Sequence, residues 1–227
     1  MVQSEVCVFI GHYALGLASK RIAPSVSLGA LFLACQFADL LWPTLVLAGV
    51  ESFTIRPGIT AVTPLAFEYY PFSHSLLTLC VWGVLLGLIY RAVTGSSWRA
   101  AIVLCALVVS HWVLDVVVHR RDMPLAPGLG YHLGLGLWNS VPGTLAVEFL
   151  LYAIGVVVYL KSTVARDRVG SIGLWMLLLF LAIVELANVL GPPPPSVLAV
   201  AWSAQAMWLI VIWGYWVDRH RELSIKS

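Results

Sequence analysis

The stretch Ser110-His111-Trp112-Val113-Leu114-Asp115-Val116-Val117-Val118-His119 ends an apolar run that begins near Trp98. Within it, His111, Asp115 and His119 follow one another at intervals of four residues. On a helix this spacing places side chains on one face, with a rise of about 6 Å per interval. Ionisable side chains inside an apolar membrane segment are costly and therefore indicate a functional site. His111 and His119 would lie about 12 Å apart, so we do not expect both to bind one ion.

The composition is typical of an integral membrane protein. Of the 227 residues, 60% are hydrophobic and only 11% are charged, whereas about a quarter of the residues of a soluble domain are charged. The net charge of +2 is not gathered into a basic stripe, which argues against a nucleic-acid partner. The four cysteines stand singly in apolar segments, so we expect neither disulfides nor a cysteine zinc site.

Runs bounded by charges, prolines and glycines predict an all-α, polytopic membrane helix bundle of about seven transmembrane segments. The segments cover roughly residues 5–19, 25–50, 72–93, 98–120, 141–161, 170–190 and 196–217. The first is shorter than the ~20 residues that a spanning helix needs, so it could be re-entrant or interfacial. We expect one integral membrane domain over residues 1–227, in which 10–120 supply the metal-site helices and 141–218 form three supporting helices.

Basic residues at alternate connections predict the orientation of the bundle. Lys20-Arg21, the Arg91 to Arg99 turn, the 161–168 connection and the 219–226 tail are basic and should be cytoplasmic by the positive-inside rule. Arg120-Arg121 is the exception. The N-terminus is therefore expected outside and the C-terminus in the cytoplasm.

Under this topology, ionisable residues from six segments fall in one layer near the outer face. They are His12, Asp39, His74, His111, Asp115, Glu148 and Glu185. Charges that merely snorkel would occupy both ends of the helices, so the layer predicts one polar cavity open to the outside. Histidine and aspartate supply the lone pairs that zinc or a harder divalent ion needs. The candidate metal ligands are His12, Asp39, His74, His111 and Asp115, with His119 at the rim.

Four motifs occur in order within residues 10–120. They are Gly11-His12, Ala38-Asp39, Phe72-Ser73-His74-Ser75 and His111-x3-Asp115. In this order they resemble the LexA-binding, inner-membrane-associated metal-dependent hydrolase family, which is similar in pattern to the zinc-dependent phospholipases C. The marks of that family are an early His, a Pro-Asp-x-Asp element, a His-Arg-x-x-Thr-His-Ser element and a late His-x3-Asp. The resemblance implies metal-binding roles for the five candidate ligands and a location in the cell's inner (plasma) membrane.

The chain departs from the family pattern at three positions. Leu41 occupies the second Asp position, Ser73 replaces Thr, and Tyr69 stands where the first His of its element would be. A second metal would therefore need Glu68 or His119 as a substitute ligand. The last three segments carry no resemblance.

These features predict a membrane-embedded hydrolase that uses a divalent metal, zinc before manganese or magnesium, on a lipid or lipid-linked ester or phosphoester. Asp39 or Asp115, whichever is not a ligand, could act as general base, and His119 could protonate the leaving group. The alternatives are a proton- or ion-coupled transporter or channel, and a non-catalytic membrane protein with a structural polar core. Alternating access usually needs repeat symmetry and a midplane site, and the sequence shows neither. The expected partners are the bilayer and a lipid-like substrate, and the sequence does not identify a protein partner.

Overall fold

The structure is a computed structural model that describes residues 10–224. Helices dominate the described part of the chain. They are α1 (Ile10–Ile22), α2 (Leu28–Cys35), α3 (Phe37–Leu47), α4 (Pro71–His74), α5 (Leu76–Thr94), α6 (Trp98–Val118), α7 (Val141–Ser162), α8 (Arg168–Leu190), α9 (Val197–Ala204) and α10 (Met207–Arg219). A serine side chain accepts a hydrogen bond from the first turn of five of them, namely α2, α5, α6, α7 and α9. Such caps satisfy backbone N–H groups that have no partner within the helix.

Five helical segments in the described residues are long and apolar enough to cross a membrane. They are α5, α6, α7, α8 and the continuous stretch over α9 and α10. A sixth is present if α2 and α3, which meet at an angle of 58°, are counted as one broken span. The described chain is thus mostly helical, with five candidate membrane-spanning segments that suggest a membrane protein, but the expected count of seven spans is not confirmed. The predicted first segment is represented by α1, which has 13 residues, and its residues 5–9 lie outside the described part, as does the N-terminus.

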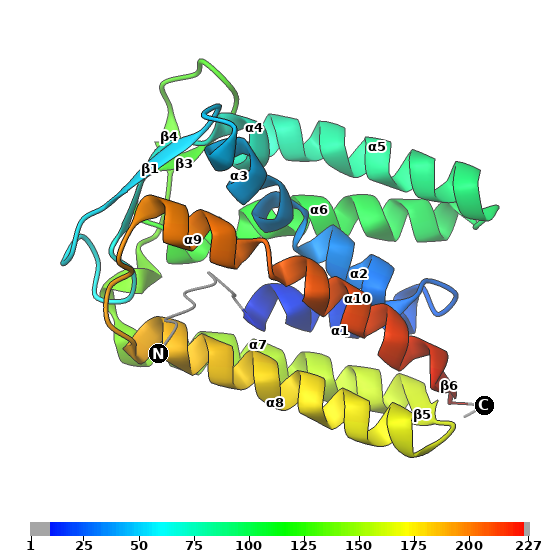
Figure 1. The fold of residues 1–227 in the computed structure, drawn as a ribbon. Coiled ribbons are helices and arrows are strands. Elements are labelled where there is room, and N and C mark those ends of the chain that lie inside the picture. The colour runs from blue at the N-terminus through cyan, green and yellow to red at the C-terminus, as the bar shows by residue number, and fades with distance from the viewer. Residues whose placement is uncertain (1–9, 225–227) are drawn as a thin grey trace.

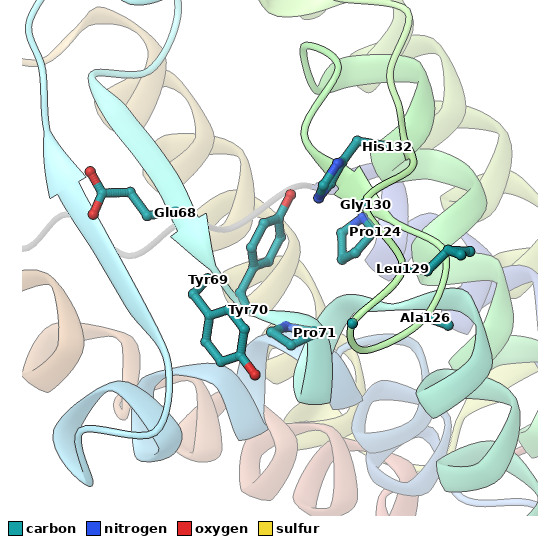
Figure 2. Close-up of a pocket in the computed structure, with 10 residues that line it drawn as sticks. Glu68, Tyr69, Tyr70, Pro71, Pro124, Ala126, Leu129, Gly130 and His132 are labelled. Carbon is teal, nitrogen blue, oxygen red and sulfur yellow. The ribbon is translucent and has the colours of Figure 1, made fainter.

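Within residues 10–224, three two-stranded antiparallel sheets modify the all-α expectation. The hairpin of β1 (Ser52–Ile55) and β2 (Leu65–Tyr69) and the pair β3 (Met123–Pro124) and β4 (His132–Leu133) lie at one end of the bundle. The pair β5 (Thr163–Ala165) and β6 (Arg221–Leu223) lies at the opposite end (Figure 1). Residues 68–71 and residues 124–132 line a cavity of about 260 Å³ at the first end (Figure 2).

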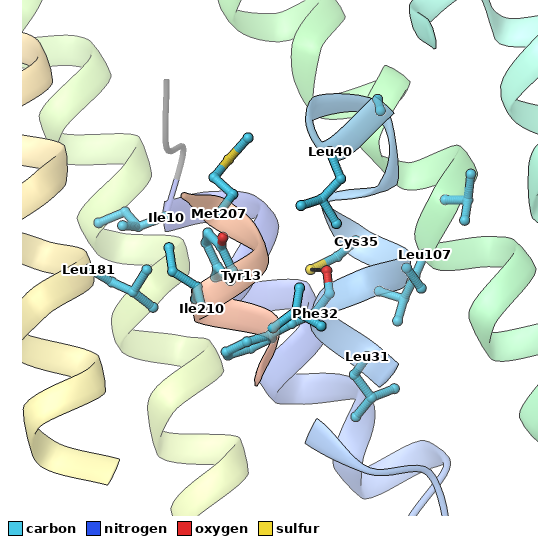
Figure 3. Close-up of a cluster of buried hydrophobic side chains, with 14 of the residues drawn as sticks. Ile10, Tyr13, Leu31, Phe32, Cys35, Leu40, Leu107, Leu181, Met207 and Ile210 are labelled. Carbon is cyan, nitrogen blue, oxygen red and sulfur yellow. Dashed lines mark hydrogen bonds between the residues drawn. The ribbon is translucent and has the colours of Figure 1, made fainter. Parts of the chain in front are cut away.

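Helix α1 lies inside the bundle, between α2, α6 and α7. Its apolar side chains Ile10 and Tyr13 pack with Phe32 of α2 and Ile210 of α10 in the core (Figure 3). On its other side, Gly155 of α7 approaches the backbone of α1 so closely that a Cβ atom there would lie 2.5 Å from the carbonyl oxygen of Ala14. Only a glycine permits this approach, so the position of α1 depends on α7.

Candidate metal centre

Five side chains predicted as metal ligands lie together in the interior. His12 is on α1, Asp39 on α3, His74 on α4, and both His111 and Asp115 are on α6. Each is at most 6% exposed. We refer to these five residues as the His–Asp cluster. Because its members come from four helices, the packing of the bundle determines the geometry of the cluster.

Asp115 lies at the centre of the His–Asp cluster. Its Oδ1 atom is 3.2 Å from Nε2 of His12. Its Oδ2 atom is 3.2 Å from Nε2 of His111 and 3.9 Å from Nε2 of His74. Asp39 approaches two of the same rings, with Oδ1 at 3.3 Å from Nε2 of His74 and Oδ2 at 3.7 Å from Nε2 of His111. All three Nε2 atoms are therefore directed at the two carboxylates.

Two overlapping sets of three ligand atoms satisfy the spacing of a metal site. One set is His12, His111 and Asp115, and the other is Asp39, His74 and His111, with all donor atoms of a set within 4.8 Å of one another. The rings of His12 and His111 also stack, with their centroids 3.9 Å apart and their planes 4° apart. The buried His and Asp groups could thus hold a metal ion.

The hydrogen-bond pattern supports a cation at this place. Nδ1 of His111 lies 2.9 Å from the carbonyl oxygen of Cys35, which can only accept, so Nδ1 carries the hydrogen. In the neutral ring, the lone pair of Nε2 then points at the two carboxylates. Among the described residues, Oδ2 of Asp39 and Oδ2 of Asp115 have no hydrogen-bond partner. Buried lone pairs that face one another are unfavourable without a positive charge between them, and a divalent cation would supply it.

Glu148 on α7 explains the glycine of the Gly11-His12 motif. Its Oε2 atom accepts a hydrogen bond of 2.6 Å from the backbone N–H of Gly11. A Cβ atom on residue 11 would lie 2.8 Å from the same oxygen. The predicted supporting helices therefore also reach the site, because α7 anchors the backbone next to His12.

His119 does not belong to the His–Asp cluster. Helix α6 ends at Val118, and the backbone of His119 is extended, so the expectation that His119 continues the face of His111 and Asp115 is wrong. Its Nδ1 atom lies 3.0 Å from Oδ1 of Asp122, and its ring packs 4.1 Å from that of Trp138. The helix ends two residues before the predicted boundary at residue 120, which is enough to turn this side chain away.

The other suggested substitute ligand, Glu68, is also remote from the cluster. It lies on β2, is exposed, and pairs with Arg56 at 2.7 Å. Tyr70 separates the cluster from His119, because its ring centroid is 5.3 Å from that of His74 and 6.3 Å from that of His119. Burial, together with the neighbouring Asp122, raises the pKa of the Tyr70 hydroxyl well above its usual range, so this group stays protonated.

Two buried residues behind His74 were given no role in the site from the sequence, although Ser73 belongs to the Phe72-Ser73-His74-Ser75 motif. Ser73 lies 2.7 Å from the Nδ1 atom of His74, and Glu51 accepts hydrogen bonds from Ser73 and from the backbone of Phe72. In the sequence, Glu51 is an ordinary loop charge. The one available signal was its position directly after the apolar run that ends at Val50.

Comparison with known proteins identifies no family for this chain. The chain matches no protein-family model, no curated protein and no solved structure. The functional argument therefore rests on the His–Asp cluster and its surroundings.

Proposed function

We propose that the protein is a membrane-embedded, metal-dependent hydrolase that acts on a lipid or lipid-linked ester or phosphoester. The observation that carries the proposal is the buried His–Asp cluster, in which three imidazoles and two carboxylates meet and two carboxylate oxygens have no hydrogen-bond partner among the described residues. Such ionisable groups inside a membrane protein are costly and are retained for function. The motif order, which resembles that of the inner-membrane metal-dependent hydrolases, agrees with this proposal.

The donor set fits zinc best. Three histidines with one or two carboxylates are usual zinc ligands, and manganese also accepts this mixture, whereas magnesium prefers oxygen ligands and water. When bound, a divalent cation would lower the pKa of a water molecule and polarise a phosphoryl or acyl oxygen.

The two carboxylates take different roles in this proposal. Asp115 lies within 3.9 Å of all three histidines, which suits a ligand. Asp39 approaches only two of them, His74 and His111. Asp39 is therefore the better general base, placed to accept a proton from the attacking water. His119 lies beyond Tyr70, and we assign it no step.

The cavity of about 260 Å³ beside Tyr70 is the proposed approach for substrate. Tyr69, Tyr70 and Pro71 line one side of it, and the 124–132 loop lines the other (Figure 2). Tyr70 both lines the cavity and packs against His74 of the His–Asp cluster, so the cavity lies next to the cluster. The position of the cavity at the end of a membrane bundle favours a lipid-linked substrate, and the inner membrane is the proposed location.

Metal analysis of the purified protein tests the proposal. We expect near-stoichiometric zinc or manganese in the wild type, measured by elemental mass spectrometry in samples prepared without chelator. His111→Ala and Asp115→Ala should lose it, whereas His220→Ala, which removes a partly exposed histidine at the C-terminal end of α10, should retain it. Release of product from lipid esters or phosphoesters by the wild type, absent in His111→Ala, would complete the test. Metal absent from every sample would refute the metal-dependent mechanism and favour a transporter.

A further inference from the structure

Three buried polar groups form a line behind the metal-facing side of His74. Oε2 of Glu51 lies 2.6 Å from Oγ of Ser73, and the same Oγ lies 2.7 Å from Nδ1 of His74. Glu51 is only 3% exposed, and Ser73 is fully buried. A buried carboxylate is costly unless hydrogen bonds compensate it, so its neighbours are informative.

The hydrogen atoms in this line can point in only one direction. Oε1 of Glu51 accepts hydrogen bonds from the backbone N–H groups of Phe72 and Ser73, at 2.8 and 2.9 Å. Oε2 accepts the single hydroxyl hydrogen of Ser73, since a carboxylate has no hydrogen to donate. The Ser73 oxygen therefore presents a lone pair to His74, and Nδ1 of His74 must carry a hydrogen.

The hydrogen on Nδ1 determines the state of Nε2, the other nitrogen of the His74 ring. A neutral imidazole with hydrogen on Nδ1 has its free lone pair on Nε2. Nε2 of His74 is the atom that lies 3.3 Å from Asp39 in the His–Asp cluster. His111 is held in the same tautomer by a different acceptor, the carbonyl oxygen of Cys35.

We propose that Glu51, acting through Ser73, is a positioning residue that holds His74 as the Nδ1–H tautomer and so presents Nε2 as a metal donor. The metal role of His74 rests on the proposed function, but the tautomer does not. Partners that orient a ligating histidine usually change metal affinity about 10- to 100-fold when they are removed. Glu51 also connects the start of the β1–β2 hairpin to Phe72 and Ser73 through two backbone hydrogen bonds. A test must therefore separate the orientation of His74 from the attachment of the hairpin.

Glu51→Gln makes this separation. The amide oxygen can still accept from the two backbone N–H groups, so the hairpin stays attached. The amide NH₂ then takes the place of Oε2 and donates to Ser73, which turns its own hydrogen toward Nδ1 of His74. The ring is driven to the Nε2–H tautomer, in which no lone pair faces the cluster. A nearly isosteric change thus reverses the direction of two hydrogen bonds.

The experiment uses the full-length protein in detergent and two measurements. Zinc affinity is measured by competition with a chromophoric chelator, and the His74 tautomer is read from its ring ¹⁵N shifts in metal-free protein at mildly alkaline pH. We expect Glu51→Gln to weaken zinc binding about 10- to 100-fold and to move the hydrogen to Nε2. Ser73→Thr retains the hydroxyl and should stay near wild type. Glu68→Gln, which changes the exposed glutamate of the same hairpin, is the matched control.

The two proposals can fail separately. Wild-type zinc affinity and an unchanged tautomer in Glu51→Gln would overturn the positioning role, whatever the protein does. A wild type that binds no zinc would overturn the proposed function, while the ¹⁵N comparison would still decide the role of Glu51. If Glu51→Gln does not fold, Ser73→Ala replaces it, because it leaves both backbone hydrogen bonds of Glu51 in place. It should give a mixture of His74 tautomers, and a pure Nδ1–H form would refute the proposal.

Discussion

Replacing Gly155 by alanine should displace α1 from α7. The new Cβ atom would lie 2.5 Å from the carbonyl oxygen and 2.7 Å from the Cα atom of Ala14, whereas ordinary contact begins at 3.4 Å. Both neighbours are backbone atoms and cannot rotate away, so α1 must move by about 1 Å. Overpacking of this kind costs about 1–3 kcal/mol. His12 lies only two residues before Ala14, so its distance of 3.2 Å to Asp115 should change as well.

We therefore expect Gly155→Ala to lower both the unfolding temperature and the zinc affinity. For a chain of this size, 1 kcal/mol corresponds to about 2–4 °C in the unfolding temperature. Tryptophan fluorescence during heating in detergent measures the first effect, and a zinc competition titration measures the second. Gly130→Ala is the control, because no atom lies within 4 Å of a Cβ at that position. If Gly155→Ala has the unfolding temperature and the zinc affinity of the wild type, α1 is not held by this contact.

Three further predictions follow from other parts of the structure. Zinc affinity should fall as the pH is lowered, because protons compete for the imidazole donors. A pH-independent affinity in zinc titrations would argue against histidine ligands. Lys20→Met should destabilise the protein by about 3 kcal/mol, because it removes the ammonium group 2.8 Å from the carboxylate of Asp218. Denaturant unfolding measures this loss, and the double variant Lys20→Met/Asp218→Leu should recover part of the lost stability. Hydrogen bonds from His220 and the backbone of Gly170 lower the pKa of Asp167. The ionised Asp167 therefore stabilises the fold at pH values above the pKa that it has in the unfolded chain. This stabilisation is lost as the pH falls through the lower pKa of the folded state. Asp167→Asn should flatten this acid decline in thermal unfolding, and an unchanged pH profile would contradict the assignment.

The residues of the candidate site could be predicted from the sequence because they are ionisable and interrupt long apolar segments. An Asp or His within an apolar run stands out, and the spacing of His111 and Asp115 on one helix already places two of them side by side. The common depth of His12, Asp39 and His74 depended only on segment boundaries, which hydropathy locates to within a few residues. The structure brings these five side chains together.

Other features could not be read from the sequence, for identifiable physical reasons. The role of Glu51 depends on backbone N–H groups about twenty residues further along the chain, and no local pattern reports such a contact. His119 was misplaced because a helix end is uncertain by one or two residues, and a single residue decides which way this side chain points. The length rule for spans also does not apply to α1, because protein surrounds most of its surface.

The dependence of α1 on Gly155 and Glu148 has a consequence for biosynthesis. Every member of the His–Asp cluster has been synthesised once residue 115 has left the ribosome. Two contacts that position α1, those of Glu148 and Gly155, nevertheless come from α7, which follows later in the chain. The first half of the protein can therefore enter the membrane with all its donors and still lack the arrangement that holds a cation. If the cluster binds a metal as proposed, the site is complete only when α7 has packed beside α1.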